Sequence, residues 1–169
     1  DHGNVRHVGG TGVGGGTIMG LGRLLFNESE PAAIEALADR GEPARLNLTI
    51  GDLGYTDISF LPQTATVSNF AAIKSDRDED KAAALLCLVA EVVGVMASLC
   101  AREAGCPDHI VMVGQVADNR HVRETLRLVE KLNNTTFSFP AQPRIATAYG
   151  ATLYCRHQLA QRGPPRHLN

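Results

Sequence analysis

The sequence lacks tryptophan, has few other aromatic residues and carries no strong excess of either charge. With a formal net charge of −2, nothing favours a nucleic acid or an anionic membrane as a partner. The four cysteines show neither a CxxC motif nor a Cys/His ligand spacing, so no metal site is predicted and free thiols in a reducing compartment are expected. We find no signal peptide and expect no apolar run to span a bilayer, which predicts a cytoplasmic protein.

The length of 169 residues predicts one domain with a sizeable core. We expect a single lobe over residues 1–162 and a flexible tail at 163–169. The chain begins at Asp1, without methionine, and reaches a glycine-rich segment within a few residues. We therefore expect an N-terminal part to be missing or supplied by another piece.

The glycine-rich segment runs from Gly9 to Thr17 and continues into apolar residues at helical spacing, at Ile18, Leu21 and Leu24. A glycine turn that opens a helix directs several N–H groups at one point, beside the positive end of the helix dipole. This pattern predicts an anion site, most commonly for phosphate; the alternative is a tight glycine hairpin without a ligand. No lysine follows as in a Walker A loop, and no Rossmann βαβ spacing is present.

The spacing of hydrophobic residues and the positions of turn residues predict the other helices and strands. Gly41 is expected as a left-handed C′ residue after the second helix, and Ser68 or Asn69 as an N-cap, with ligand contact as the less favoured role. Helices are predicted at 18–26, 31–38, 66–73, 78–104, from about 119 onward, and 144–161, and strands at 4–8, 46–50, 110–113 and 135–139.

The helix at 78–104 is the longest and carries a broad apolar stripe. Because the stripe is wider than one small sheet needs, part of it is expected to face a partner subunit. Gly94 either allows close helix contact or is neutral. The acidic segment Asp76–Asp80 is interpreted as a solvated helix start, in preference to a metal site.

The apolar run Ile110–Val113 is typical of a buried parallel strand. Ligands in α/β sheets bind beyond the carboxyl ends of such strands, which makes Gly114 and Gln115 candidates for a nucleotide contact. A plain strand-to-helix turn is the alternative.

The segment Val8–Thr17, with Gly20-Leu21 and Leu24-Leu25, resembles the glycine motif of type II pantothenate kinases. The resemblance covers about residues 5–155 and continues through Ala38-Asp39-Arg40-Gly41, Ser68-Asn69-Phe70, Val111-Met112-Val113-Gly114 and Tyr149-Gly150-Ala151. It implies an α/β fold, the C-terminal lobe of a ribonuclease H-like, actin-like ATPase, with a mixed sheet flanked by helices. It also implies a kinase that uses ATP and Mg²⁺ to phosphorylate pantothenate in coenzyme A synthesis, with acetyl-CoA or CoA as a candidate regulator.

The resemblance also implies roles for individual residues. Gln115 matches a nucleotide contact, Arg6 and His7 lie at the substrate position, and helix 78–104 matches a dimer-forming helix. The nucleotide's phosphates would lie along Gly12, Gly14, Gly15, Gly16, Thr17, Ile18 and Met19. The catalytic base is expected in the missing N-terminal lobe, so these 169 residues alone are expected to be inactive.

The sequence departs from the family pattern at three places. Active members generally carry arginine where this chain has His7, Pro31 replaces an aromatic residue, and Ile145-Ala146-Thr147 differs from the small-residue pattern before Tyr149. These departures leave two alternatives: a non-catalytic, pseudokinase-like module that binds a nucleotide or coenzyme A and dimerises, or a related small-molecule kinase.

Overall fold

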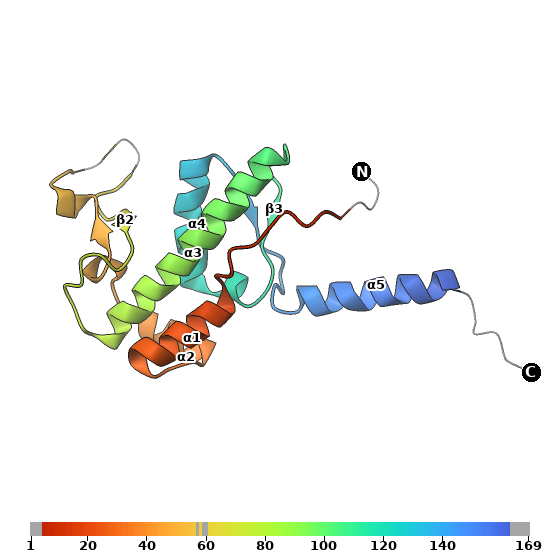
Figure 1. The fold of residues 1–169 in the computed structure, drawn as a ribbon, viewed down its shortest axis with the longest axis horizontal. Helices are drawn as coiled ribbons and strands as arrows, with labels where there is room; N and C mark the ends of the chain where they lie inside the picture. Colours follow the sequence, from red (N-terminus) through yellow and green to blue (C-terminus); the bar gives the residue numbers. More distant parts are fainter. Residues whose placement is uncertain (1–4, 57, 59–60, 163–169) are drawn as a thin grey trace, which may run out of the picture.

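The long helix α3 (Asp78–Glu103) lies at the centre of the molecule and confirms the longest predicted helix. We describe the protein on a computed structural model, in which residues 5–56, 58 and 61–162 are described, with side chains as far as Gln158. The predicted turn at Gly3-Asn4 and the predicted tail at 163–169 lie outside these residues. Figure 1 shows α3 crossing the body from one end to the other.

Three helices and a 3₁₀ turn pack around α3: α1 (Gly15–Phe26), α2 (Pro31–Ala38), α4 (Arg120–Asn133) and η1 (Pro43–Arg45). Their apolar faces bury one core, because each helix carries apolar residues three and four positions apart. The largest fully buried apolar side chains of this core are Ile34, Leu85, Leu86, Val89, Val122 and Leu126.

Two small sheets flank this helical body. Strand β1 (Leu48–Thr49) pairs antiparallel with β2 (Thr66–Ser68), and β3 (Ile110–Val111) pairs parallel with β4 (Phe137–Ser138). The α/β class is therefore as predicted, but the described residues form two two-stranded sheets in place of the one mixed sheet expected. Residues 5–13 form no strand, because no neighbouring strand pairs with them. Val111 is 61% exposed, so β3 is not the fully buried strand predicted.

The helix predicted at 66–73 is wrong. After β2 the chain turns, with positive φ at Phe70 (55°) and Ile73 (36°). The amide of Phe70 donates to Asn47 Oδ1 at 2.9 Å, and the amide of Ala72 donates to the Leu46 carbonyl at 3.0 Å. These partners lie far away in the sequence and replace helical bonds, so neither Ser68 nor Asn69 caps a helix.

Two glycines serve close packing between elements. Gly41 is not a left-handed residue; a Cβ there would stand 1.9 Å from the carbonyl oxygen of Glu79 at the start of α3. Gly94 lies against α4, where a Cβ would stand 2.5 Å from Leu126 Cδ2. The close helix contact considered for Gly94 is therefore confirmed, whereas the C′ role of Gly41 is corrected.

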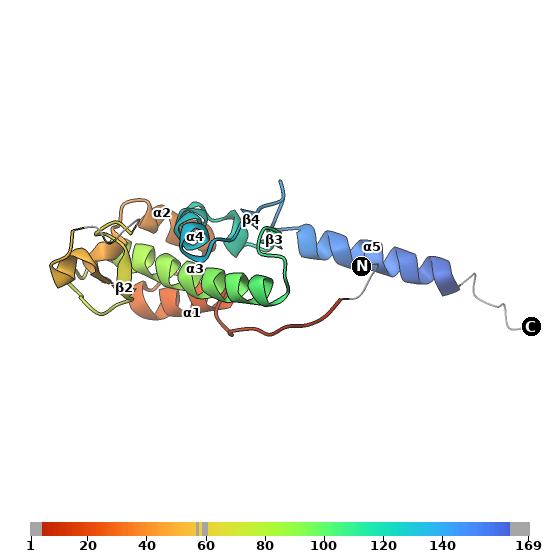
Figure 2. The same ribbon diagram turned by 90° about the horizontal axis from the view of Figure 1, so that it is seen from above.

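The last helix, α5 (Ala146–Arg162), projects from the body in both Figure 1 and Figure 2. Its apolar side chains are largely exposed, with Tyr149 at 62% and Tyr154 at 66%. A helix with so little buried surface gains little from the tertiary packing that normally stabilises helices.

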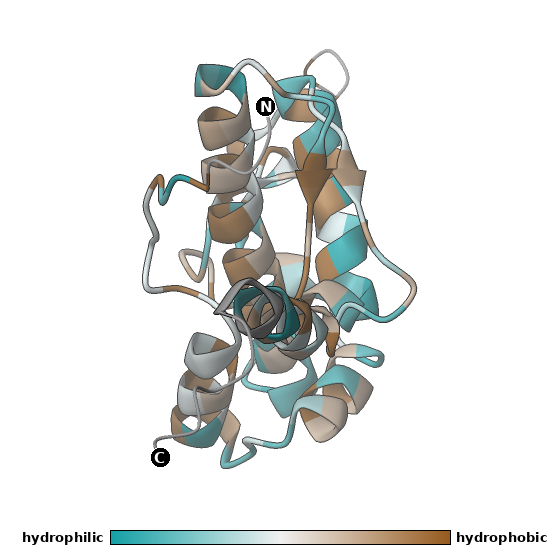
Figure 3. Ribbon diagram, turned by 90° about the vertical axis from the view of Figure 1, so that its right-hand side faces the viewer, coloured by the Kyte–Doolittle hydropathy of each residue, from teal (hydrophilic) through white to brown (hydrophobic). Residues whose placement is uncertain are grey.

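Helix α3 is long and apolar enough to cross a membrane by length and composition, contrary to the expectation that no run would be. Half of the residues in its apolar window are buried inside the protein. Figure 3 shows hydrophobic residues along several of its turns.

Candidate functional site

Two threonine hydroxyls fix the glycine turn that precedes α1. Thr11 Oγ1 accepts a hydrogen bond from the amide of Val13 at 3.1 Å. Thr17 Oγ1 accepts from the amide of Gly14 at 3.1 Å and donates to the carbonyl of Gly12 at 3.3 Å. Gly12 adopts a φ of 69°, which disfavours any residue with a side chain. The sequence T-G-V-G-G-G-T therefore folds into a turn braced from within.

The first N–H groups of α1, those of Gly15 and Gly16, have no acceptor among the described residues. The first N–H groups of a helix have no partner within it. No acidic residue occupies the first turn, so no carboxylate offsets the positive end of the dipole. The turn is thus open and suited to an anion.

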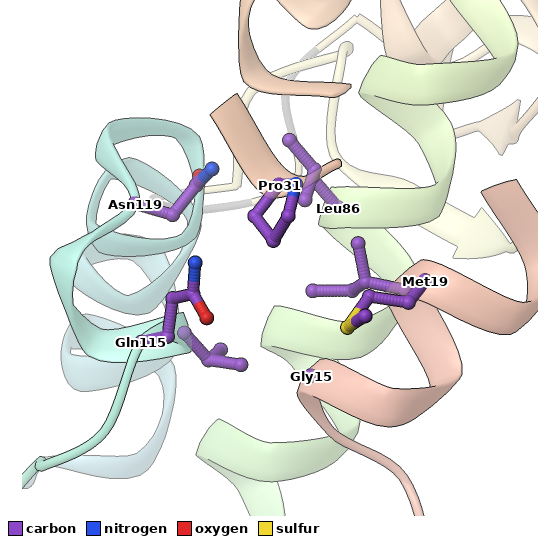
Figure 4. Close-up of a pocket in the computed structure, with 8 residues that line it drawn as sticks. Gly15, Met19, Pro31, Leu86, Gln115 and Asn119 are labelled. Carbon is purple, nitrogen blue, oxygen red and sulfur yellow. The ribbon is translucent and has the colours of Figure 1, made fainter. Parts of the chain in front are cut away.

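A pocket beside this turn brings together two predicted segments that lie about a hundred residues apart. Gly15 and Met19 from α1 lie across it from Gln115, as Figure 4 shows, and Ile18 of α1 also lines it. Its volume is about 40 Å³, enough for about three water molecules and far below a complete ligand pocket of roughly 300–1,000 Å³. The remaining lining residues are Pro31, Leu86, Val116 and Asn119.

Gln115 reaches the pocket because the chain turns sharply after β3. Gly114 has a φ of 92° and its amide donates to the carbonyl of Pro143 at 2.8 Å. The 3₁₀ turn η3 (Val116–Asp118) follows, and Asn119 caps α4 by accepting from the amide of Val122 at 3.1 Å. The Gln115 side chain takes part in no hydrogen bond with another described residue, so its amide is free to contact a ligand.

The other predicted residues lie apart from the pocket. Gly14, Gly16 and Thr17 belong to the turn beside it, and Gly12 lies on the exposed side of that turn. Arg6 and His7 lie on an exposed, extended arm and are not brought to Gln115.

Sequence reasoning missed several pocket residues. Leu86 comes from the core face of α3 and Pro31 opens α2, and neither carried a sign of ligand contact. Asn119 had a local signal, because an asparagine before an amphipathic helix is a preferred cap. A neighbouring open groove adds four charged side chains that sequence reasoning also missed, Glu30, Glu35, Asp118 and Arg144.

The acidic segment before α3 is occupied by internal contacts. Lys81 Nζ lies 2.8 Å from Asp76 and 3.1 Å from Asp78. Burial acts to raise the pKa of Asp80, but hydrogen bonds from Ser75 Oγ (2.6 Å) and the Glu42 amide (2.8 Å) hold it below its ordinary value. Asp80 is therefore buried, not solvated as expected. Within the described ranges, no three His, Cys, Asp or Glu side chains converge as a metal site would require.

Comparison with known proteins adds the family context. Residues 1–134 match the model of the family described as Fumble. The chain is 36% identical over 162 residues to a protein named type II pantothenate kinase from a strain of Bacillus cereus, and 36% identical over 156 residues to one from Bacillus anthracis. A third protein of that name, from Oceanobacillus iheyensis, is 28% identical over 153 residues.

These alignments cover 92%, 89% and 89% of this chain but 58%, 56% and 58% of the relatives. The chain therefore spans somewhat over half the length of the curated relatives it matches, and corresponds to their C-terminal part.

Proposed function

The chain belongs to the Fumble family, and from this premise we propose that it forms the C-terminal lobe of a pantothenate kinase of the actin-like ATPase superfamily. In this proposal the complete protein transfers a phosphoryl group from ATP to the hydroxyl of pantothenate, a step of coenzyme A synthesis. The relatives' shared name supports the substrate and reaction. The observation that carries the proposal in this chain is the open glycine turn at the start of α1.

The turn would hold the phosphates of the nucleotide. The N–H groups of Gly15 and Gly16 are available as donors, and the positive end of the α1 dipole lies behind them. Gly12, Gly14 and Thr17 keep the turn in shape, while Ile18, Met19 and Gln115 line the pocket beside it. Because phosphoryl transfer is achieved mainly by positioning and charge stabilisation, fixed amide donors of this kind are suitable catalytic parts.

The remaining parts would come from the N-terminal lobe. The pocket, at about 40 Å³, is too small for a nucleotide, and β3 and α5 leave apolar side chains exposed, including Val111 and Tyr149. Both features fit a surface that the other lobe covers. We place the catalytic base there, and we expect the isolated 169 residues not to phosphorylate pantothenate.

The described residues offer magnesium no carboxylate cluster. The proposal therefore assigns Mg²⁺ to the nucleotide and the other lobe. Arg6 and His7 are proposed to face the substrate once the arm that carries them is packed against that lobe.

The proposal includes a homodimer formed through α3. Three apolar side chains near its C-terminal end occupy one face at i, i+1 and i+4 and remain partly exposed: Val95 at 39%, Met96 at 41% and Leu99 at 47%. A second copy could bury this face. A cytoplasmic location and regulation by CoA or acetyl-CoA complete the proposal.

The test is ATP-dependent formation of phosphopantothenate by the complete protein, alongside a panel of sugars. If pantothenate is phosphorylated and the sugars are not, the result supports the proposal. If only a sugar is phosphorylated, the protein is a related small-molecule kinase instead. If the complete protein binds ATP or CoA but transfers nothing, it is the non-catalytic module. A His7→Arg variant separates these cases further, since it would raise activity only in an enzyme.

A further inference from the structure

Arg123 on α4 makes three contacts, two of them with the turn after β3 and one with the end of β4. Its Nε donates to the carbonyl of Ala117 at 2.7 Å, and its Nη2 lies 3.5 Å from Asp118 Oδ1. Its guanidinium carbon stands 4.8 Å from the ring centroid of Phe139, just after β4. One side chain thus joins α4, η3 and the end of β4.

The hydrogen bond from Arg123 to the Ala117 carbonyl is the most important of these three contacts for holding the turn. Ala117 is fully buried, and a buried carbonyl without a donor costs free energy. A planar guanidinium can donate to this carbonyl, face a carboxylate and lie over a ring at the same time, which a lysine ammonium cannot do. Arg123 is also two-thirds buried, so its geometry is constrained.

The turn that Arg123 holds is one wall of the pocket. Gln115 precedes η3 and Asn119 follows it, and both line the pocket on the wall opposite Met19 and Gly15, as Figure 4 shows. Asp118 also lies 4.0 Å from Arg144 Nε, just before α5. A shift of η3 would therefore move the wall relative to the glycine turn.

We infer that Arg123 is a positioning residue that holds residues 114–119 in place, so that Gln115 and Asn119 face the glycine turn. What the pocket binds rests on the proposed function; the restraint on the turn does not. Arg123 itself is not among the residues that line the pocket and acts through η3.

The first test needs no activity. Hydrogen exchange is measured in the chain for three amides bonded within or at the turn, those of Gly114, Asp118 and Asn119. In Arg123→Met we expect these amides to exchange about tenfold faster, while amides in the centre of α3 keep their rates. Arg127→Met, on an exposed residue one turn further along α4, is the matched control and should change neither set. Wild-type rates at the turn, or equal acceleration in α3, would overturn the inference.

Two further variants separate the contacts. Phe139→Leu removes the ring and leaves the Ala117 bond, so a smaller acceleration is expected. Arg123→Lys keeps the charge without the planar fork and should resemble Arg123→Met; full recovery of slow exchange in this variant would contradict the inference.

The second test uses the complete protein and its kinetics. Arg123→Met should raise the KM for ATP about tenfold, equivalent to about 1.4 kcal/mol, and leave the KM for pantothenate unchanged. A loosened turn with an unchanged KM for ATP would overturn the positioning role. Should the wild-type protein show no kinase activity while the turn still loosens in the first test, the restraint stands and the proposed function fails.

Discussion

The backbone of Gly41 lies directly against the carbonyl of Glu79, where α2 leads into the loop that crosses the start of α3. The next amide, that of Glu42, donates to Asp80 Oδ1 at 2.8 Å. The loop after α2 is therefore fixed to the N-terminus of α3 by a close backbone approach and a buried carboxylate. This junction holds α2, and with it Pro31, against the helix that provides Leu86 to the pocket.

The first prediction concerns this junction. Gly41→Ala places a Cβ 1.9 Å from a backbone oxygen, so the chain must shift, and we expect a loss of about 3 kcal/mol in the free energy of unfolding. Gly20→Ala is the control, because no atom lies within 4 Å of its added Cβ; it should stabilise α1 by about 0.5–1 kcal/mol. Urea unfolding measures both, and similar shifts in the two variants would contradict the packing described.

A second prediction concerns the hydroxyl that braces the glycine turn. Thr17→Val keeps the side chain's shape but removes its bonds to Gly14 and Gly12, so we expect a loss of about 1 kcal/mol in unfolding free energy. Binding of ATP to the complete protein should weaken as well. Thr17→Ser retains the hydroxyl and should behave as wild type in thermal unfolding and in ATP titration. Equal behaviour of the valine and serine variants would show that the brace is unimportant.

Acid should weaken the link between Asp52 and Lys74. A hydrogen bond from Lys74, with others from the Thr49 amide and hydroxyl at 2.9 Å, lowers the pKa of Asp52 from 3.8 to about 2. A carboxyl whose pKa is depressed in the folded state stabilises it above pH 3.8, and this contribution is lost as the pH falls toward 2. Asp52→Asn should therefore lower the Tm at about pH 7.

The difference in Tm between Asp52→Asn and wild type should shrink between about pH 4 and pH 2. Glu103→Gln, on an exposed residue at the end of α3, gives the background effect of removing one acidic group. A difference in Tm that stays constant over this pH range would rule out the assigned link.

The cysteines should differ sharply in reactivity. Burial, and next the nearby Glu91, raise the pKa of the Cys87 thiol to about 12, whereas Cys155 is exposed on α5. Because the thiolate is the reacting form, iodoacetamide at about pH 8 should label Cys155 quickly and leave Cys87 unmodified until the protein unfolds. Mass spectrometry of the labelled peptides measures this, with labelling in urea as the reference. Rapid labelling of native Cys87 would contradict its burial.

A further prediction tests the proposed dimer. Leu99→Glu places a charge in the exposed apolar face of α3 and should convert a dimer of the complete protein to monomers in sedimentation velocity. Leu132→Glu, on a similarly exposed leucine of α4, is the matched control and should remain dimeric. A wild-type monomer, or dissociation in both variants, would remove α3 as the interface.

The sequence allowed good prediction of the helices because their signals are local. The apolar period of α3, Pro31 at the start of α2 and the Asn119 cap of α4 all lie within or beside the element that they define. The helix prediction for residues 66–73 failed because the interactions that fix this segment are not local. Its amides find partners at Leu46 and Asn47, more than twenty residues away, and no local pattern records such a bond.

The candidate site was predictable only in part. The glycine turn and Gln115 could be found from the sequence, because a dense run of glycines before a helix and a polar residue after an apolar strand are local signals. Leu86 could not, since a leucine that lines a pocket is indistinguishable in the sequence from any other on the core face of α3. Arg123 was missed as well, because its three partners come together only in the folded chain.

The projecting helix α5 has a consequence for the chain in solution. Because its described side chains are mostly exposed, this seventeen-residue helix should melt at a lower temperature than the body and should be cut first by trypsin, at Arg156. The helical circular dichroism signal of α5 can therefore report assembly. Under the proposed function, a gain in ellipticity when the N-terminal lobe is added would mean that α5 packs against that lobe through its exposed tyrosines.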